Sequence, residues 1–273
     1  MPPASPKPRS RARPPKPHPA RARIPEIIAR LDGAYGLPEW RPHHDPTSEL
    51  VLTILSQNTS DANSGRAFAR LLEAFPSWDA VASAPLPALI AAIQPGGLAP
   101  TKAPRIQAVL RDIKERTGGS FDLSFLGELP LQEARDWLRA LHGVGPKTVA
   151  CVLLFALGRP AMPVDTHVFR VAMRLGLIPE RIPVVRRTPP RESRQPTTDH
   201  RSAAMTPEKA HALLEAAVAP DDFYAFHIGL IKHGRRTCAA QRPRCDVCVL
   251  RDLCPSAAAF TRKPSQTARR RPG

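Results

Sequence analysis

Four cysteines near the C-terminus constrain this chain more than any other feature of its sequence. Cys238, Cys245, Cys248 and Cys254 are separated by six, two and five residues. Thiolates spaced so closely can converge on one metal centre within a single compact loop. Both a structural zinc ion and a 4Fe–4S cluster accept four cysteine ligands. Two disulfides would need an oxidising compartment, and nothing in the sequence indicates secretion. The spacing therefore predicts a metal site.

The body of the chain carries the apolar spacing of helices, without an alternating pattern long enough for a useful strand. The sequence therefore predicts an all-α fold. Asp61 is expected to cap the third helix, and Thr117-Gly118-Gly119 to end the sixth. The predicted helices cover Ile24–Leu31, Pro46–Leu55, Asp61–Phe75, Ser77–Ala84, Leu86–Ile93, Lys102–Arg116, Leu131–Leu141, Lys147–Leu157, Asp165–Leu175, Pro207–Val218 and Asp222–His233.

Positive charge is concentrated at the two ends of the chain. The formal net charge of +16 indicates a polyanionic partner such as nucleic acid. Residues 1–25 hold nine prolines and seven cations without an acid, and residues 262–273 hold five more cations, so four positive charges remain for the body. We expect basic tails over residues 1–23, which should be disordered, and over residues 256–273. Their role would be electrostatic capture of DNA.

Further expectations concern the cellular context and one insertion. The sequence holds no apolar run of about 18 residues, so it predicts no membrane span. The N-terminus lacks the apolar stretch of a secretory signal. We therefore expect a cytoplasmic protein, associated with the nucleoid if the organism is bacterial. Arg186–Ser202, rich in Arg, Pro and Thr, is predicted to be a long surface loop, and a DNA-contacting loop is the less favoured alternative.

A glycine-rich turn separates two predicted helices at Leu141–Thr148. Gly143 and Gly145 permit a tight turn with exposed backbone N–H groups, and the next helix begins at its positive end. Such a turn can hold a DNA phosphate without reading the base sequence. Glycine turns are common between helices, so this motif gains weight only from the residues around it.

This turn, the stretch Gly158–His167 and the cysteine spacing together resemble the endonuclease III superfamily. Members of that superfamily carry a helix–hairpin–helix followed by a Gly/Pro-rich segment that ends in an aspartate, here Asp165. The resemblance covers residues 24–253 apart from the insertion. Two residues depart from the pattern, because His142 stands where proline is usual and Val149 where alanine is frequent.

The resemblance implies catalytic roles for two side chains. Lys147 matches the nucleophilic lysine of bifunctional members, and Asp165 matches the carboxylate that assists it and stabilises positive charge on the sugar. Each residue also has a plain structural explanation. Lys147 would otherwise be a solvated lysine beside a phosphate. Asp165 opens a predicted helix, where aspartate is a favoured N-cap.

A stacked base cannot reach such a lysine unless its nucleotide is flipped out of the duplex and the gap is filled. By resemblance, Gln57 is the gap-filling glutamine and Leu98 is the apolar wedge that enters the opposite strand. The alternatives are a polar residue at a helix end and a core leucine. The other residues that we predict to contact DNA are Gly143, Gly145, Thr148 and His167. For His167 a structural role is the favoured interpretation.

The resemblance further implies an architecture of two helical domains that flank a DNA-binding cleft. Residues 46–157 would form a six-helix bundle with the helix–hairpin–helix. Residues 24–45 and 158–255 would form a discontinuous domain around the four cysteines. Their cofactor would be one 4Fe–4S cluster, with zinc as the alternative.

The implied function is base-excision repair by a monomeric DNA glycosylase and abasic-site lyase. It would remove oxidised pyrimidines from duplex DNA and nick the strand by β-elimination through a Schiff base on Lys147. One alternative is a monofunctional or mismatch glycosylase. The other is a non-enzymatic helix–hairpin–helix module with structural zinc. The sequence does not reveal the preferred lesion or the opposite base.

Overall fold

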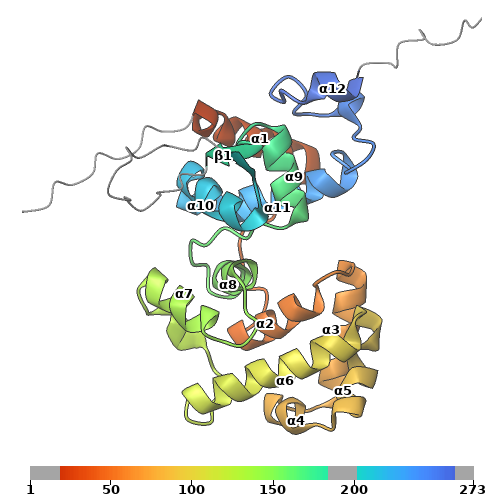
Figure 1. Cartoon of the computed structure of the whole chain (residues 1–273), viewed down its shortest axis with the longest axis vertical. Coiled ribbons are helices and arrows are strands. Elements are labelled where there is room, and N and C mark those ends of the chain that lie inside the picture. Colours follow the sequence, from red (N-terminus) through yellow and green to blue (C-terminus); the bar gives the residue numbers. More distant parts are fainter. Residues whose placement is uncertain (1–18, 184–201, 262–273) are drawn as a thin grey trace, which may run out of the picture.

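Helices form nearly all of the regular secondary structure of the described residues and gather into two groups (Figure 1). The computed structural model describes residues 19–183 and 202–261. The predicted all-α class is confirmed. Most of the predicted N-terminal tail, residues 262–273 of the C-terminal tail and residues 186–201 of the predicted insertion lie outside the described residues. No described helix is both long enough and apolar enough to cross a bilayer.

The first group contains the middle of the chain and occupies the lower part of Figure 1. Its apolar faces meet in one core, which includes Leu50, Ile54, Ile106, Leu110 and Leu153. Its α-helices are α2 (Pro46–Leu55), α3 (Asp61–Ala74), α4 (Trp78–Ser83), α5 (Leu86–Ile93), α6 (Ala99–Arg116), α7 (Leu131–Arg139) and α8 (Pro146–Cys151). A π-helical turn over Val152–Ala156 follows α8 directly.

The second group combines the beginning and the end of the described chain, because α1 packs against α11. Its core includes Ile27, Leu31, Phe226, Leu230 and Leu250. Its elements are α1 (Ile24–Tyr35), α9 (Thr166–Arg174), β1 (Arg181–Pro183), β2 (Ser202–Ala204), α10 (Pro207–Ala217), α11 (Phe223–Arg236) and α12 (Ala257–Thr261). We propose the domain division 46–157 against 24–45 with 158–255 on the basis of these two cores.

Hydroxyl or carboxylate side chains cap α2, α3, α9 and α10, whereas α8 and α11 have no side-chain cap. Asp165 caps α9 as predicted, since its Oδ1 accepts a hydrogen bond from the N–H of Val168 at 2.7 Å. The prediction for α3 is wrong. There Ser60 is the cap and accepts from the N–H of Asn63, while Asp61 is the first residue of the helix. A serine hydroxyl reaches this N–H as well as a carboxylate does.

The small antiparallel pair of β1 and β2 is absent from the sequence prediction. Ile182 lies opposite Ala203 in this pair. Each strand is only three residues long. A segment of that length cannot display an alternating pattern, so the pairing is decided by the surrounding fold.

Both predicted tails are shorter than the sequence suggested. Pro19–Arg23 forms a 3₁₀ turn, and the guanidinium of Arg23 donates a hydrogen bond of 2.7 Å to the carbonyl of Leu253. At the other end, the ring of Phe260 in α12 lies 4.6 Å from the Arg174 guanidinium. A cation that hydrogen-bonds to a carbonyl or stacks on an aromatic ring belongs to the folded body, whatever the composition of its segment.

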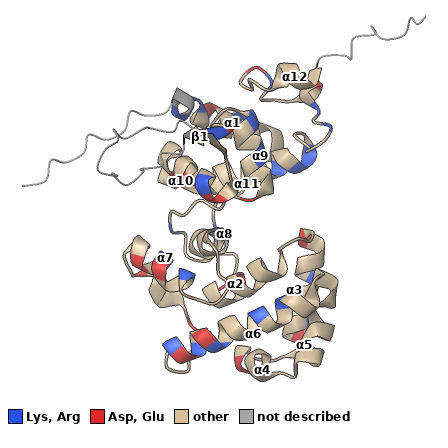
Figure 2. Cartoon of the chain, in the orientation of Figure 1, with Lys and Arg blue, Asp and Glu red and all other residues tan. Residues whose placement is uncertain are grey.

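Charged residues of both signs lie on both groups (Figure 2). Several of them pair with each other, as Arg30 does with Asp252 and Arg235 with Asp61. The mixture agrees with the small net charge that remains when the two basic ends are set aside.

Lys102 joins two turns that both carry candidate DNA-contacting residues. It is 4% exposed. Its Nζ donates to the carbonyl of Leu55 at 2.6 Å and to the carbonyl of Gly96 at 2.9 Å. Leu55 ends α2 two residues before Gln57, and Gly96 lies two residues before Leu98. The lysine therefore fixes both turns from within the first group.

Replacing Lys102 by Met should lower the free energy of unfolding by about 2 kcal/mol, because two buried carbonyls lose their donor. Urea denaturation measures this change. Lys114→Met in the same helix is the control, since Lys114 makes only an exposed ion pair with Asp79 and should change stability by less than about 1 kcal/mol. Equal effects of the two substitutions would contradict the assigned role of Lys102.

Candidate active site

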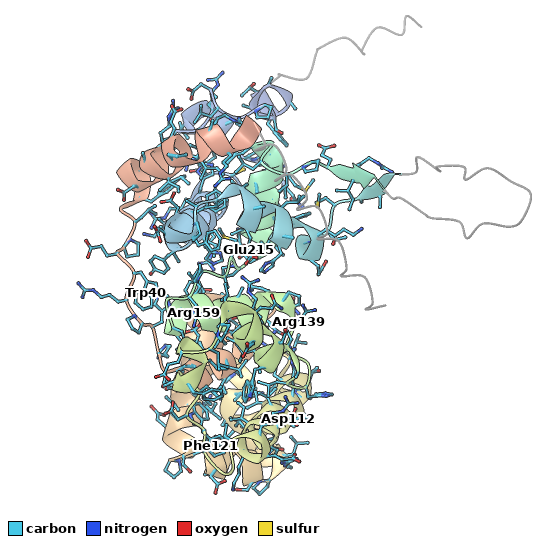
Figure 3. All side chains as sticks on the ribbon, turned by 90° about the vertical axis from the view of Figure 1, so that its left-hand side faces the viewer. Trp40, Asp112, Phe121, Arg139, Arg159 and Glu215 are labelled. Atoms are coloured by element: carbon cyan, nitrogen blue, oxygen red, sulfur yellow. The ribbon has the colours of Figure 1, made fainter. Side chains whose placement is uncertain are left out.

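Side chains from both groups tie them together, and Figure 3 labels Trp40, Arg159 and Glu215 in this junction. Nε1 of Trp40 donates to the carbonyl of Leu154 at 2.7 Å. Arg135 of α7 contacts both carboxylate oxygens of Glu215 in α10, at 3.1 and 2.7 Å. Two parallel bonds between guanidinium and carboxylate fix orientation as well as distance. The relative position of the groups is therefore well defined.

A cavity of about 720 Å³ opens between the two groups. Its walls come from α2, α8 and α11 and from the beginnings of α9 and α10. A volume of this size lies within the range of roughly 300–1,000 Å³ that is usual for ligand sites. Lys147, Asp165, Gln57 and His167 all line it. Four of the predicted site residues are thus brought together, although long stretches of sequence separate them.

The predicted hairpin lies between α7 and α8. Gly143 has a φ of +68°, a conformation that favours glycine, and Gly145 is the N-cap of α8. Arg105 of α6 donates a hydrogen bond to the Gly143 carbonyl. The N–H of His142 donates to Oδ2 of Asp112 at 3.0 Å (Asp112 is labelled in Figure 3). Proline would have no N–H for this bond, so the departure at His142 has a structural purpose.

Lys147 and Asp165 sit at the beginnings of two different helices and face one cavity. Lys147 follows Pro146 in the first turn of α8 and is half-buried. In the described part of the chain its Nζ has no hydrogen bond or ion pair. Asp165 is also half-buried and is held by its bond to the Val168 N–H. The arrangement places a free amine and a fixed carboxylate in the same pocket, as nucleophilic catalysis requires.

The two residues predicted to open the duplex lie at turns with unusual backbone angles. Gln57 lines the cavity, and its Oε1 accepts a 2.8 Å hydrogen bond from Arg105. Leu98 is 54% exposed at the turn before α6. Among the described non-glycine residues, Asn58 and Leu98 alone have positive φ, at 54° and 52°. Such strain persists where the surrounding structure enforces it, often at functional sites.

Of the other predicted DNA-contacting residues, Thr148 is buried and His167 lines the cavity. Thr148 is 3% exposed, so its side chain packs within the protein and does not support the predicted contact with DNA. Thr148 is the third residue of α8, in the first turn of the helix. His167 lines the cavity, and its Nδ1 lies 3.1 Å from Nη2 of Arg170. Burial lowers the pKa of His167, which favours the neutral ring.

The sequence reasoning missed polar residues deep in the cavity. Glu49 of α2 is 5% exposed, and burial raises the pKa of its carboxyl to about 7. His211 of α10 is 9% exposed, and burial lowers its pKa. Glu49 Oε2 and His211 Nε2 have no hydrogen-bond partner among the described residues. The available signal was an acidic residue directly before the mostly apolar stretch Leu50–Leu55 of α2.

The four cysteines lie together beside α9, α11 and α12 and line one small pocket. Within the described chain, no three or more His, Cys, Asp or Glu side chains surround a common point closely enough to hold a single metal ion. A shared pocket does not require such a common centre. A four-iron cluster binds one thiolate at each iron, so its four ligands lie farther apart than those of a single ion. For a cluster the relevant observation is that all four cysteines line one pocket.

The surroundings of the thiols suit bound thiolates. Arg174 Nη1 lies 3.2 Å from the Cys238 Sγ, and the N–H of Leu250 donates to the Cys248 Sγ at 3.4 Å. Burial raises the pKa of Cys245, and likewise those of Cys248 and Cys254. A cationic metal centre would supply the charge that keeps them ionised. In kind and number the four cysteine thiols therefore match the ligands of a 4Fe–4S cluster.

A model of the HhH-GPD superfamily of base excision DNA repair proteins matches residues 51–188. The matched range is about half of the chain and includes the hairpin, Lys147 and Asp165. The chain belongs to this superfamily. It is an endonuclease III-like DNA glycosylase of base excision repair, so the non-enzymatic alternative is wrong.

Curated relatives place this glycosylase beside endonuclease III. The endonuclease III of Sulfolobus acidocaldarius is 31% identical over 207 residues, which cover 75% of this chain and 79% of the relative. That of Escherichia coli K12 is 31% identical over 238 residues, covering 84% and 93%. A candidate DNA glycosylase of Arabidopsis thaliana, At3g47830, is 46% identical, but over 131 residues that span 48% of this chain and 44% of the relative.

Solved structures give the same assignment. A trapped covalent intermediate of endonuclease III with DNA, an estranged-adenine complex, matches with a TM-score of 0.69 and 26% identity. The match covers 89% of this chain and 99% of the other. A non-covalent endonuclease III–DNA complex matches equally well. The glycosylase therefore shares the fold of proteins captured on DNA.

Replacing Gly143 by Ala should weaken duplex binding by the glycosylase about tenfold, because a left-handed backbone costs a non-glycine residue roughly 1–2 kcal/mol. The new Cβ would also lie 2.9 Å from Nε of Arg105. Fluorescence anisotropy with a duplex that carries an uncleavable abasic analogue measures the affinity. Gly33→Ala in α1, with open space around its Cβ, is the control and should bind normally. Normal binding by Gly143→Ala would remove the hairpin from the DNA interface.

Proposed function

We propose that this DNA glycosylase is bifunctional, with Lys147 as the nucleophile that removes a damaged base and then nicks the strand. The observation that carries the proposal is the shared cavity of Lys147 and Asp165. One of the similar solved structures is endonuclease III trapped in a covalent intermediate with DNA. A covalent intermediate needs a nucleophile on the protein, and Lys147 is the amine that the motif and the cavity both supply.

The chemistry follows from the two side chains. The neutral amine of Lys147 attacks the anomeric carbon and the base departs, while the Asp165 carboxylate stabilises the positive charge that develops on the sugar. The resulting Schiff base then permits β-elimination of the 3′-phosphate. Gln57 and Leu98 would fill the gap that the flipped nucleotide leaves and separate the bases around it.

Oxidised pyrimidines in double-stranded DNA, and abasic sites, are the substrates that we propose. The support is the set of endonuclease III relatives that align along most of the chain. We also propose that the protein acts as a monomer in the cytoplasm, on nucleoid DNA if the organism is bacterial. The two groups of helices already enclose the cavity within one chain.

We propose that Cys238, Cys245, Cys248 and Cys254 hold a 4Fe–4S cluster rather than zinc, because the described thiols do not surround one point closely enough for a single ion. Such a cluster would supply no group to base removal and would hold the loop between α11 and α12 in shape. Within the protein, Arg174 also stabilises the conformation of this loop. It donates to the carbonyls of Ala239 and Ala240, both at 2.7 Å, and so orders the same loop.

The purified protein should be yellow-brown and contain iron and acid-labile sulfide in nearly equal amounts. Cys245→Ser should lower both contents and the melting temperature, because metal binding contributes folding free energy. Cys151→Ala is the matched control, since Cys151 is the fifth cysteine and lies outside the pocket of the other four. A colourless, folded protein with one zinc ion after anaerobic preparation would refute the iron–sulfur assignment.

Lys147→Gln should abolish both base removal and covalent trapping while lesion binding survives. The glutamine keeps most of the volume and removes the amine. Borohydride added during turnover on an oxidised-pyrimidine duplex should link the wild-type protein to DNA at Lys147, as peptide mapping would show. Lys232→Gln is the control, because Lys232 lines the cavity but donates to the carbonyl of Gly36 at 2.8 Å. If Lys147→Gln still released free base and only nicking were lost, water would be the nucleophile of a monofunctional enzyme.

A further inference from the structure

Glu49 is a buried acid that the mechanism above does not use. It lies on the cavity side of α2, one helical turn before Thr53 and two turns before Gln57 at the cavity mouth. Its Oε1 accepts a weak hydrogen bond from the Thr53 hydroxyl at 3.4 Å. Its Oε2 has no partner among the described residues. A leucine or glutamine could occupy this place without an unpaired anionic oxygen, so packing does not explain the acid.

The burial of Glu49 favours its neutral form. Loss of water around the carboxylate raises its pKa to about 7, and the Thr53 hydrogen bond opposes this only in part. The other titratable groups that line the cavity are Asp61, which pairs with Arg235, and Lys147, Cys151, Asp165, His167, Glu208, His211, His227 and Lys232. Burial lowers the pKa of His167 and of His211, so it favours the neutral form of both rings. Burial raises the pKa of the Cys151 thiol to about 12 and lowers the pKa of His227 to about 4, so both stay neutral at pH 7.

The two cavity carboxyl groups therefore suit different tasks. Asp165 accepts a backbone N–H bond, which fixes its carboxyl group beside the start of α9. Glu49 has no backbone donor and is enclosed, which suits an acid that still carries its proton. Active sites commonly pair two carboxyl groups whose environments separate their roles in this way.

We propose that Glu49 is a further catalytic residue, which hydrogen-bonds to the extruded pyrimidine and protonates it as it leaves. The proposal rests on the proposed function of Lys147. As Lys147 Nζ bonds to C1′, the C1′–N1 bond breaks and its electron pair passes to the base. The Glu49 proton moves to the O2 carbonyl oxygen of the base, so the base departs neutral. The carboxylate regains a proton from water once the base has gone.

Glu49→Gln tests the proposal, because it keeps the shape and the hydrogen bonds but removes the acidic proton. Single-turnover base release from a duplex with 5-hydroxyuracil should fall about 100-fold, the usual contribution of general acid catalysis. Cleavage of a preformed abasic site, which has no base to protonate, should stay within about threefold of the wild type. Glu73→Gln on exposed α3 is the matched control and should leave both rates unchanged.

Two further measurements test whether Glu49 carries a proton in the folded protein and whether base release uses it. The wild-type rate of base release should fall as the pH rises through about 7, and Glu49→Gln should lack this decline. Glu49 prefers its proton in the folded state, so it stabilises the fold below the unfolded pKa near 4.5 and loses this effect as the pH rises to about 7. The melting temperature of Glu49→Gln, relative to wild type, should therefore be higher at pH 8 than at pH 5.

Several outcomes would overturn the inference. Base release by Glu49→Gln at the wild-type rate would show that the proton is not needed. An equal loss of base release and abasic-site cleavage would make Glu49 a support for Lys147. A relative melting temperature that did not rise with pH would mean that Glu49 is ionised. Wild-type protein that releases no pyrimidine would refute the proposed function and this inference together, whereas the first three results leave the proposed function standing.

Discussion

The short stretch that leaves α8 is the constraint on which the rest of the structure depends, because it packs in both cores at once. Leu153 belongs to the first core, whereas Leu154 and Phe155 belong to the second. The π-helical turn over Val152–Ala156 alters the direction of these side chains. Its Leu154 carbonyl accepts from Trp40 at 2.7 Å. Lys147, at the other end of the same helix, is thereby fixed relative to both groups.

Cations in this molecule serve the fold as well as DNA. Lys102 and Arg105 bind backbone carbonyls at the turns that carry Gln57, Leu98 and the hairpin. Such bonds replace the water that the charges lose, and they position loops that would otherwise move independently. The small net charge of the body therefore does not show how many cations bind backbone carbonyls inside it. A count of Lys and Arg likewise does not show which of them face a phosphate.

The cavity gathers features that a purely structural core would avoid. Asn58 at its wall and Leu98 nearby in the first group have left-handed backbones, and Glu49 and His211 each have an unpaired polar atom among the described residues. Each of these lowers stability, and Glu49, Asn58 and His211 line the same cavity as Lys147 and Asp165. Proteins keep such local costs where a substrate supplies the missing partner or where geometry must be held.

The sequence by itself determined the helical class, most helix positions, the hairpin and the Asp165 cap, and its motifs predicted a shared site for Lys147 and Asp165. Each of these features depends on residues close together in the chain or on a motif with a fixed order. They can therefore be predicted from the local spacing of residues. Only the tertiary structure decided that Glu49 faces the same cavity, that Thr148 points inward, that Ser60 caps α3 and that β1 pairs with β2. Burial and long-range pairing depend on which elements pack against each other. The local spacing of residues in one sequence does not specify these long-range contacts.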